Sequence, residues 1–295
     1  MTTSASPSWL EDLSTSLTGA VAAVAPSTVA VHSHRSRSSG FIWRSGLIVT
    51  ADEALSEEGE IAVTLAGGET IQATLAGRDP TTDIALLRID RTDLAPTPLH
   101  KTELAAGSLT LVVGAEDGRP TAALGIVSRS GGAWRSLRGG EIDARLELDL
   151  SIRRRAEGGL VLSAAGQAVG MAVFGPRRRV LVIPAATIER VAARLESHGR
   201  IARGYLGLGL QPVAVEGAEE SGAMVMSVDP KGPGATAGIH QGDILVAWND
   251  EPIPHVQPLL RALGPDSVGQ VVTLGLRRAG ESRQVSLLIA ERPAA

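Results

Sequence analysis

The chain has no cysteine and no long apolar run. Without cysteine it can form neither a disulfide nor a thiolate nucleophile, and it cannot hold zinc or an iron–sulfur cluster through cysteine ligands. No segment approaches the roughly 18 apolar residues that a membrane-spanning helix needs, so we expect no membrane span. Residues 1–31 also lack the basic start of a secretory signal peptide. The sequence as it stands therefore predicts a cytoplasmic protein without an export signal.

An excess of one charge sign is also missing. The sequence has 28 Lys and Arg against 32 Asp and Glu, a net charge of −4. This balance gives no electrostatic case for binding nucleic acid or an anionic membrane surface, and we expect neither partner. What the chain does have is 43% hydrophobic residues over 295 positions, enough for about two domains with real cores.

Short segments divide the first two thirds of the chain. "SWLE" is a capping box with Ser8 as N-cap and Glu11 at N3, which predicts an N-terminal helix that ends near Pro26. Residues 27–183 carry many short β-branched or alternating segments separated by Gly, Pro, Asp and Ser. Such a pattern is typical of barrels and sandwiches, and the number of segments favours two six-stranded barrels. A helix over 184–200, stopped by Gly199, closes this part.

A smaller unit follows Arg203. "YLGLGL", "GAMVMSV", "DILVAWND" and "VVTLGLRR" predict strands, and "HVQPLLRALG" predicts a short helix. This mixture suits a compact binding module. We therefore expect an N-terminal segment at 1–26, a double β-barrel at 27–200 and an α+β domain at 204–292.

Several motifs occur in a characteristic order: "SSGFIWRSGLIVTADEAL", "GRDPTTDIALLRID", "RAEGGLVLSAAGQAVGM", "RGYLGLGLQP" and "GAMVMSVDPKGPGATAGIHQGDILVAWNDEPI". Together they resemble the HtrA/DegP family, over nearly the whole chain. The resemblance implies a mainly β fold class, with a trypsin-like double β-barrel followed by a PDZ domain. It also implies serine endopeptidase activity in protein quality control, a mostly cell-envelope location, and trimers formed through N-terminal segments. Trp9 and Leu10 are candidate contacts for such trimers.

Two of the three catalytic positions implied by the resemblance are changed. The family's Thr-x-x-His pattern ends here at Glu53. Its Asp-x-x-x-Asp pattern matches Asp79 and Asp83, and Asp83 takes the catalytic place. Its Gly-Asn-Ser-Gly-Gly pattern reads Arg-Ala-Glu-Gly-Gly over 155–159, so Glu157 replaces the nucleophile.

These changes remove the chemistry of a serine protease, which needs a hydroxyl activated by an imidazole. A carboxylate at 157 cannot form a useful acyl-enzyme, and loss of Ser or His alone costs roughly a millionfold in turnover. Arg155 replaces a glycine whose positive φ would aim an amide into the oxyanion hole, so we expect that hole to be distorted. The remaining His and Ser residues nearby lack the spacing to replace the triad: His32, His34, Ser151 and Ser163.

If the fold holds, the carboxylates of Glu53, Asp83 and Glu157 converge. Two carboxylates about 4 Å apart repel by about 4 kcal/mol at an effective dielectric of 20, so all three cannot be ionised, dry and unpaired. We predict pairing with the arginines of 153–155. A protonated glutamate, splayed solvated side chains, and a hard cation held by oxygen ligands are the alternatives. We expect no metal and no cofactor.

The PDZ-like unit offers a separate binding site. PDZ domains add an extended peptide C-terminus to a sheet edge and hold its carboxylate with backbone N–H groups. Gly207 suits the close backbone approach that this needs. The candidate residues are Tyr205, Leu206, Gly207 and Leu208 in the loop, and Pro258, Leu259 and Ala262 on the facing helix.

Three hypotheses follow. The chain is a catalytically inactive homologue that binds peptide C-termini or unfolded segments, an active HtrA-type endopeptidase with substituted catalysis, or a structural subunit that assembles with active homologues. Casein hydrolysis separates the second from the others, and peptide binding separates the first from the third.

Overall fold

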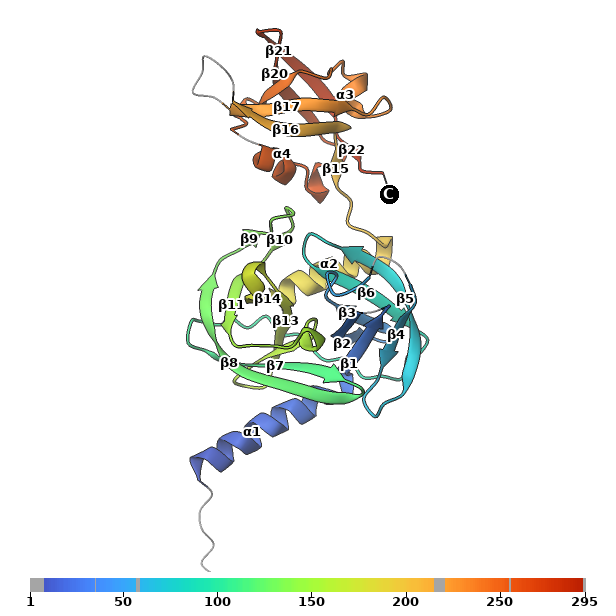
Figure 1. Ribbon diagram of the computed structural model, residues 1–295, viewed down its shortest axis with the longest axis vertical. Coiled ribbons are helices and arrows are strands. Elements are labelled where there is room, and N and C mark those ends of the chain that lie inside the picture. Colours follow the sequence, from blue (N-terminus) through green and yellow to red (C-terminus); the bar gives the residue numbers. More distant parts are fainter. Residues whose placement is uncertain (1–7, 35, 57–58, 215–220, 255, 294–295) are drawn as a thin grey trace, which may run out of the picture. The chain divides into compact units, whose positions relative to one another are not determined.

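The computed structural model describes residues 8–34, 36–56, 59–214, 221–254 and 256–293. The chain forms two compact units, Met1–Ile201 and Ala202–Ala295 (Figure 1). None of the described helices is long and apolar enough to cross a membrane.

The first unit begins with the predicted helix, α1 (Trp9–Val24), which runs into a 3-10 turn, η1 (Ala25–Ser27). The capping box is confirmed, because the Ser8 side chain accepts from the Glu11 amide and the Glu11 carboxylate accepts from the Ser8 amide. Trp9 and Leu10 are 72% and 58% exposed, so neither packs into the barrel of its own chain. Their role as subunit contacts stays a prediction.

The first barrel is closed by six antiparallel strands in the order β1-β2-β3-β6-β5-β4. The strands are β1 (Thr28–Ser33), β2 (Ser36–Arg44), β3 (Leu47–Thr50), β4 (Ile61–Thr64), β5 (Thr70–Asp79) and β6 (Ile84–Ile89). β3 is buried along its whole length, which explains its continuous apolar run.

The second barrel is closed in the order β11-β14-β13-β12-β7-β8, so the prediction of two six-stranded barrels is confirmed. Its strands are β7 (Leu109–Glu116), β8 (Arg119–Gly131), β11 (Arg145–Asp149), β12 (Leu160–Ser163), β13 (Ala168–Phe174) and β14 (Val180–Pro184). A small hairpin of β9 (Trp134–Arg135) and β10 (Glu141–Ile142) projects between β8 and β11. Two 3-10 turns, η2 (Arg154–Ala156) and η3 (Pro176–Arg178), flank β12 and β13.

One apolar cluster joins the two barrels. It contains Phe41 and Leu86 from the first barrel, Leu160 and Met171 from the second, and Leu195 from the closing helix. That helix, α2 (Ala185–His198), ends at Gly199 in the left-handed conformation, with φ +71°, as the sequence predicted. Because the barrels share a core, the loops at their junction are held in fixed positions.

The second unit is an antiparallel sheet in the order β16-β17-β18-β20-β21, with β19 paired to β18. Its elements are β15 (Gly204–Tyr205), β16 (Leu208–Ala214), β17 (Ser221–Val228), α3 (Pro233–Thr236), β18 (Ile244–Trp248), β19 (Glu251–Pro252), α4 (Val256–Ala262), η4 (Pro265–Ser267), β20 (Val271–Arg278), β21 (Glu281–Leu288) and β22 (Ala290–Glu291). β16 is an edge strand, and α4 lies against it.

A buried ion pair braces this unit. The Asp243 side chain is 2% exposed and accepts from Nε of Arg278 at 2.8 Å and from Nη2 at 2.7 Å. The His240 amide donates a third hydrogen bond to it at 2.8 Å. The Arg278 guanidinium holds the pKa of Asp243 below its usual value.

Candidate functional site

The structure brings Glu53 and Asp83 together at the barrel junction. Glu53 lies in the turn after β3, and Asp83 directly precedes β6. The backbone amide of Glu53 donates to Oδ1 of Asp83 at 2.7 Å. This bond holds the Asp83 carboxyl group beside position 53, where it could orient a neighbouring side chain.

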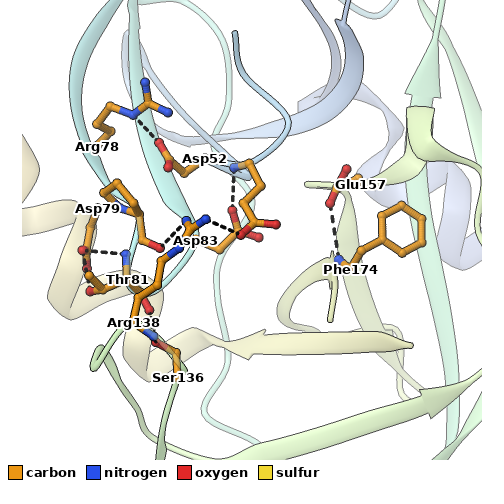
Figure 2. A network of polar contacts seen from close by, with 11 residues as sticks. Asp52, Arg78, Asp79, Thr81, Asp83, Ser136, Arg138, Glu157 and Phe174 are labelled. Carbon is orange, nitrogen blue, oxygen red and sulfur yellow. Dashed lines mark hydrogen bonds and ion pairs between the residues drawn. The ribbon is translucent and has the colours of Figure 1, made fainter. Parts of the chain in front are cut away.

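Glu157 approaches the same place from the second barrel. It follows η2 and is only 4% exposed. Its Oε1 accepts from the Phe174 amide at 3.4 Å, and Figure 2 shows this pair facing the network around Asp83. The three predicted positions therefore meet around one small volume.

The acidic groups do not all carry charge. Burial, strengthened by the neighbouring carboxylates of Glu53, Glu157 and Asp52, raises the pKa of Asp83 to about 8, although the Glu53 amide opposes the rise. Burial also raises the pKa of Glu157, against the Phe174 amide and the nearby charge of Arg154. Protonation of Asp83 thus relieves part of the repulsion expected from the sequence.

An arginine does reach the cluster, but it is not one of those predicted. Nη2 of Arg138, in the β9–β10 hairpin, lies 3.2 Å from Oε1 of Glu53, and its Nη1 donates to the Pro80 carbonyl at 3.1 Å. The Ser136 hydroxyl donates to the Thr81 carbonyl at 2.6 Å, so the hairpin is fastened to the loop before Asp83 (Figure 2).

The predicted pairing through 153–155 is wrong. Arg155 forms an ion pair with Glu116 on β7 instead. Among the described residues, neither Arg153 nor Arg154 lies within 4.0 Å of an acidic oxygen. Adjacent sequence favoured 153–155, whereas Arg138 reaches Glu53 only because β9 and β10 fold back across the junction.

The turn before Glu157 has no open oxyanion hole. Arg155 lies in the 3-10 turn rather than at positive φ. The Glu157 amide, which would have to face a substrate, donates to the Arg154 carbonyl at 3.1 Å, and the Ala156 amide donates to the Arg153 carbonyl at 2.9 Å. The distortion expected from a side chain at 155 is therefore present.

Ser39 of β2 fixes this turn from the first barrel. Its hydroxyl is buried and donates to the Arg155 carbonyl at 2.6 Å while accepting from the Ala115 amide at 2.9 Å. Its amide donates to the Glu157 carbonyl at 2.7 Å. Sequence reasoning missed Ser39, because nothing in "RSRSSG" distinguishes this serine from its neighbours.

The other histidines and serines do not rebuild a triad. Nε2 of His32 lies 3.0 Å from Oγ1 of Thr64 inside the first barrel. His34 occupies the turn between β1 and β2, and the Ser163 hydroxyl is buried without a hydrogen-bond partner. In the described parts of the chain, no hydrogen bond joins Ser151 or Ser163 to either histidine.

The raised pKa of Asp83 predicts a stability that falls with rising pH. Below pH about 8 the folded chain keeps a proton that an unfolded aspartate, with a pKa near 3.8, releases. Folding therefore takes up a proton, and raising the pH opposes it. We expect this contribution to lower the melting temperature between about pH 4 and about pH 8, and Asp83→Asn to remove much of the fall.

The matched control is Asp93→Asn. Asp93 is exposed, and hydrogen bonds from Arg91 lower its pKa to about 2, so it does not titrate in this range. Circular dichroism melts of the three proteins across the pH series make the comparison. An unchanged slope in Asp83→Asn would show that the Asp83 carboxyl group is ionised in the fold.

The loop at 205–208 of the second unit has the backbone geometry that the predicted carboxylate site requires. Gly207 has φ +74°, and a Cβ there would lie 2.9 Å from the Gly232 Cα, so a side chain does not fit. The carbonyls of Leu206 and Gly207 accept from the Gly234 and Asp229 amides. In the described part of the chain, the N–H groups of Leu206 and Gly207 donate to no backbone carbonyl. These two donors beside the edge strand β16 can receive an anion.

The other predicted PDZ residues divide into two groups. The Tyr205 hydroxyl donates to Oδ2 of Asp229 at 2.9 Å, which steadies the loop. Leu206 and Leu259 are 3% and 1% exposed and belong to the core of the second unit, so their side chains are not available to contact a ligand. Leu208 is partly buried and packs against the same core.

Comparison with known proteins matches both units. A family model described as a trypsin-like peptidase domain matches residues 38–171, and a PDZ domain model matches residues 204–289. The "Probable periplasmic serine endoprotease DegP-like" of Bartonella henselae is 32% identical over 280 residues, covering 88% of this chain and 55% of that protein. Its counterpart in Rhizobium meliloti is 30% identical over 275 residues, covering 88% and 54%. The chain thus spans about half the length of these relatives.

Solved structures show the same architecture. The serine endoprotease from Yersinia pestis has a TM-score of 0.72 and 28% identity, covering 94% of this chain and 98% of that one. The HtrA-type protease AlgW, solved with a decapeptide, has a TM-score of 0.73 and 22% identity, covering 95% and 99%, and shows the fold alone. The fold class and the resemblance inferred from the sequence are confirmed.

Proposed function

Because the chain is a DegP/HtrA homologue in which a trypsin-like peptidase domain is followed by a PDZ domain, we propose that it binds peptides without cleaving them. The observation that supports this most directly is the turn at 154–157. There a carboxylate stands in place of the nucleophile, and its amide is already bonded to the Arg154 carbonyl.

Each element of acyl transfer is affected. A hydroxyl nucleophile and an imidazole base are replaced by Glu157 and Glu53, and a protonated Asp83 is a poor partner for a histidine. Loss of an oxyanion donor alone costs about 10²–10³ in turnover, on top of roughly a millionfold for the missing triad members. These losses support a binding role over a catalytic one.

The second candidate is an active endopeptidase. It is favoured by the names of the relatives, which are serine endoproteases, and by the position of Asp83, which the Glu53 amide holds toward position 53.

Two assays on the purified chain decide between them. We expect no hydrolysis of casein and no labelling by a fluorophosphonate probe, since turnover without the Ser–His pair falls about a millionfold. A catalytically active relative run in parallel shows that the assay works. If labelling occurs and persists in Glu157→Ala, the nucleophile lies elsewhere and the binding proposal fails.

The PDZ-like unit supplies the peptide site in this proposal. An extended C-terminus adds to β16, its carboxylate lies on the N–H groups of Leu206 and Gly207, and α4 forms the other wall. We expect peptides with a hydrophobic C-terminal residue to bind and their amidated forms to bind at least about tenfold more weakly, because hydrogen bonds to a charged group contribute about 1.5–3 kcal/mol.

Isothermal titration calorimetry measures both affinities. Gly207→Ala should also weaken binding, because its Cβ meets Gly232 at a backbone with φ +74°. The matched control is Gly280→Ala, where φ is +85° but nothing lies within 4 Å. Equal binding of the free and amidated peptides would rule out carboxylate capture.

A further inference from the structure

Positive charge is concentrated in one stretch of the second barrel. Residues 128–180 hold ten arginines, no lysine and five acidic residues, a net charge of +5 in a chain whose total is −4. The rest of the chain is therefore net negative by nine charges. The net charge of the whole chain does not reveal this uneven distribution of charge along the sequence. The fold brings part of the stretch 128–180 onto one surface.

A buried glutamate lies among three of these ten arginines. Glu147 of β11 is 6% exposed. Its carboxylate lies 2.7 Å from Nη2 of Arg145, 3.2 Å from Nη1 of Arg179 and 3.8 Å from Nη1 of Arg129. The guanidinium groups, Arg145 first, hold the pKa of Glu147 below its usual value. One carboxylate balances one of three charges, and the arginine side chains are 37%, 57% and 60% exposed.

The turn at 175–179 links this group to Glu157. Arg178 lies over the Phe174 ring, 5.1 Å from its centroid. Arg154 and Arg178 are both close enough to Glu157 to oppose the rise of its pKa. The cationic surface consists of Arg129, Arg145, Arg154, Arg178 and Arg179, which make these contacts, together with Arg177, which is exposed in the same turn.

The backbone of this turn supports a role for its side chains. Arg177 and Arg178 both have φ +58°, in the left-handed region that non-glycine residues avoid. Both are exposed, and among the described residues neither forms an ion pair. Among the described residues, the contact of Arg178 with the Phe174 ring is the one packing contact that offsets this strain, and exposed residues held in a strained backbone are a pattern associated with functional segments.

We propose that the cationic surface binds an acidic segment of polypeptide. Arginine suits carboxylates because its guanidinium offers several N–H donors in one plane, and on this surface Nε and Nη2 of Arg145 both already contact Oε1 of Glu147. In an extended peptide, alternate side chains point to one face at a spacing of about 6.6–6.8 Å, so acids at alternate positions can face successive arginines. The arginines of this surface are separated by Glu147 and Glu157. A peptide can match this spacing because its carboxylates are separate charges with neutral residues between them.

Nucleic acid fits less well. Glu147 and Glu157 lie within the surface. A phosphate backbone carries a charge at every step and cannot avoid them, whereas a peptide can place uncharged residues opposite them. Single strands also need open aromatic faces on which bases stack. Here Arg178 covers Phe174 and Arg145 lies over Trp134.

This inference deepens the proposed function, on which it rests, because the surface ends at Glu157, where a peptide held by the barrels would lie. It assigns acidic segments to the barrels and leaves hydrophobic C-termini to the second unit. The two proposed sites belong to different units, so a different peptide can probe each of them.

Fluorescence anisotropy with a labelled, C-terminally amidated peptide of alternating Glu and Ser tests the proposal, since amidation keeps it off the PDZ-like loop. A peptide with Gln in place of Glu is the neutral comparison. We expect the acidic peptide to bind at least about tenfold more tightly, and the difference to shrink at about 0.5 M salt, where exposed charges are screened.

Arg177→Gly with Arg178→Gly is the informative variant, because glycine accepts the left-handed backbone and folding is not threatened. It should weaken acidic-peptide binding about tenfold or more while leaving the hydrophobic C-terminal peptide unaffected. The control, Arg37→Ser with Arg283→Ser, removes the same charge from positions that are 53% and 50% exposed and paired with exposed acids, and should bind like the wild type.

Equal binding of the Glu and Gln peptides, or equal loss in both double variants, would overturn the proposal. So would tighter binding of an oligothymidylate of the same length, which would assign the surface to nucleic acid. Mass spectrometry of the bound peptide tests the proposed function separately from this inference. Cleavage of the peptide would contradict binding without cleavage, but it would leave the assignment of the surface to acidic segments in place.

Discussion

Four substitutions together, Glu53→His, Arg155→Gly, Ala156→Asn and Glu157→Ser, give a chain that a fluorophosphonate labels at position 157, whereas Glu53→His with Glu157→Ser alone gives little labelling. The pair restores the base and the nucleophile. It leaves the turn at 154–157 in its 3-10 form, with the position-157 amide bonded to the Arg154 carbonyl. Loss of one oxyanion donor costs about 10²–10³ in rate, so we expect a difference of that order.

The additional two changes act on the turn. Glycine at 155 allows the positive φ that turns an amide toward the substrate, and it removes the ion pair from Arg155 to Glu116. Asp83 also benefits, because two of the carboxylates that raise its pKa are gone. Burial, the largest cause of that raised pKa, remains, and the backbone amide at 53 still holds the Asp83 carboxyl group beside the new imidazole.

Labelling rates and intact mass give the measurement, and the fourfold variant with Ala instead of Ser at 157 is the control. If the two-residue reversion reacts as fast as the fourfold variant, residues 155 and 156 are not the obstacle. Thermal melts of every variant establish that each is folded.

Arg278→Ala should destabilise the second unit by about 3–5 kcal/mol, the cost of leaving a buried charge without its partner. Asp243 would keep only the His240 amide as a hydrogen-bond donor among its present contacts. The bond from Arg278 to the Gly238 carbonyl, at 2.7 Å, would also be lost. Few substitutions in a domain of this size have a larger expected effect.

The matched control lies on the same hairpin. Arg283 pairs with Glu281 at 3.1 Å, but the two side chains are 50% and 74% exposed, so Arg283→Ala should cost at most about 1 kcal/mol. Hydrogen exchange of the β18 and β20 amides in the full chain reports on this unit alone. Similar losses in the two variants would show that Asp243 finds water or another partner.

Much of the fold could be predicted from local patterns. Alternating apolar residues and turn residues predicted two six-stranded barrels, and Gly199 predicted the end of α2, as the structure has them. The motifs placed Glu53, Asp83 and Glu157 at one junction, where the structure also brings them together.

What could not be predicted depends on contacts distant in sequence. Arg138 reaches Glu53 because a hairpin of the second barrel is fastened to the loop at 80–83 of the first. Arg155 turns to Glu116 because β7 passes beside η2. The protonation of Asp83 follows from burial, which a motif does not encode.

The serine of β2 has a consequence for how the protein can be divided. Ser39 binds the carbonyls of Arg155 and Glu157 and the amide of Ala115, so a residue of the opposite barrel holds the turn at 154–157 in shape. A fragment that contains only the second barrel would lack Ser39 and the hydrogen bonds that it makes to this turn. The local geometry at Glu157 is therefore a property of the assembled pair of barrels, and halves expressed separately should recover it only when they are recombined.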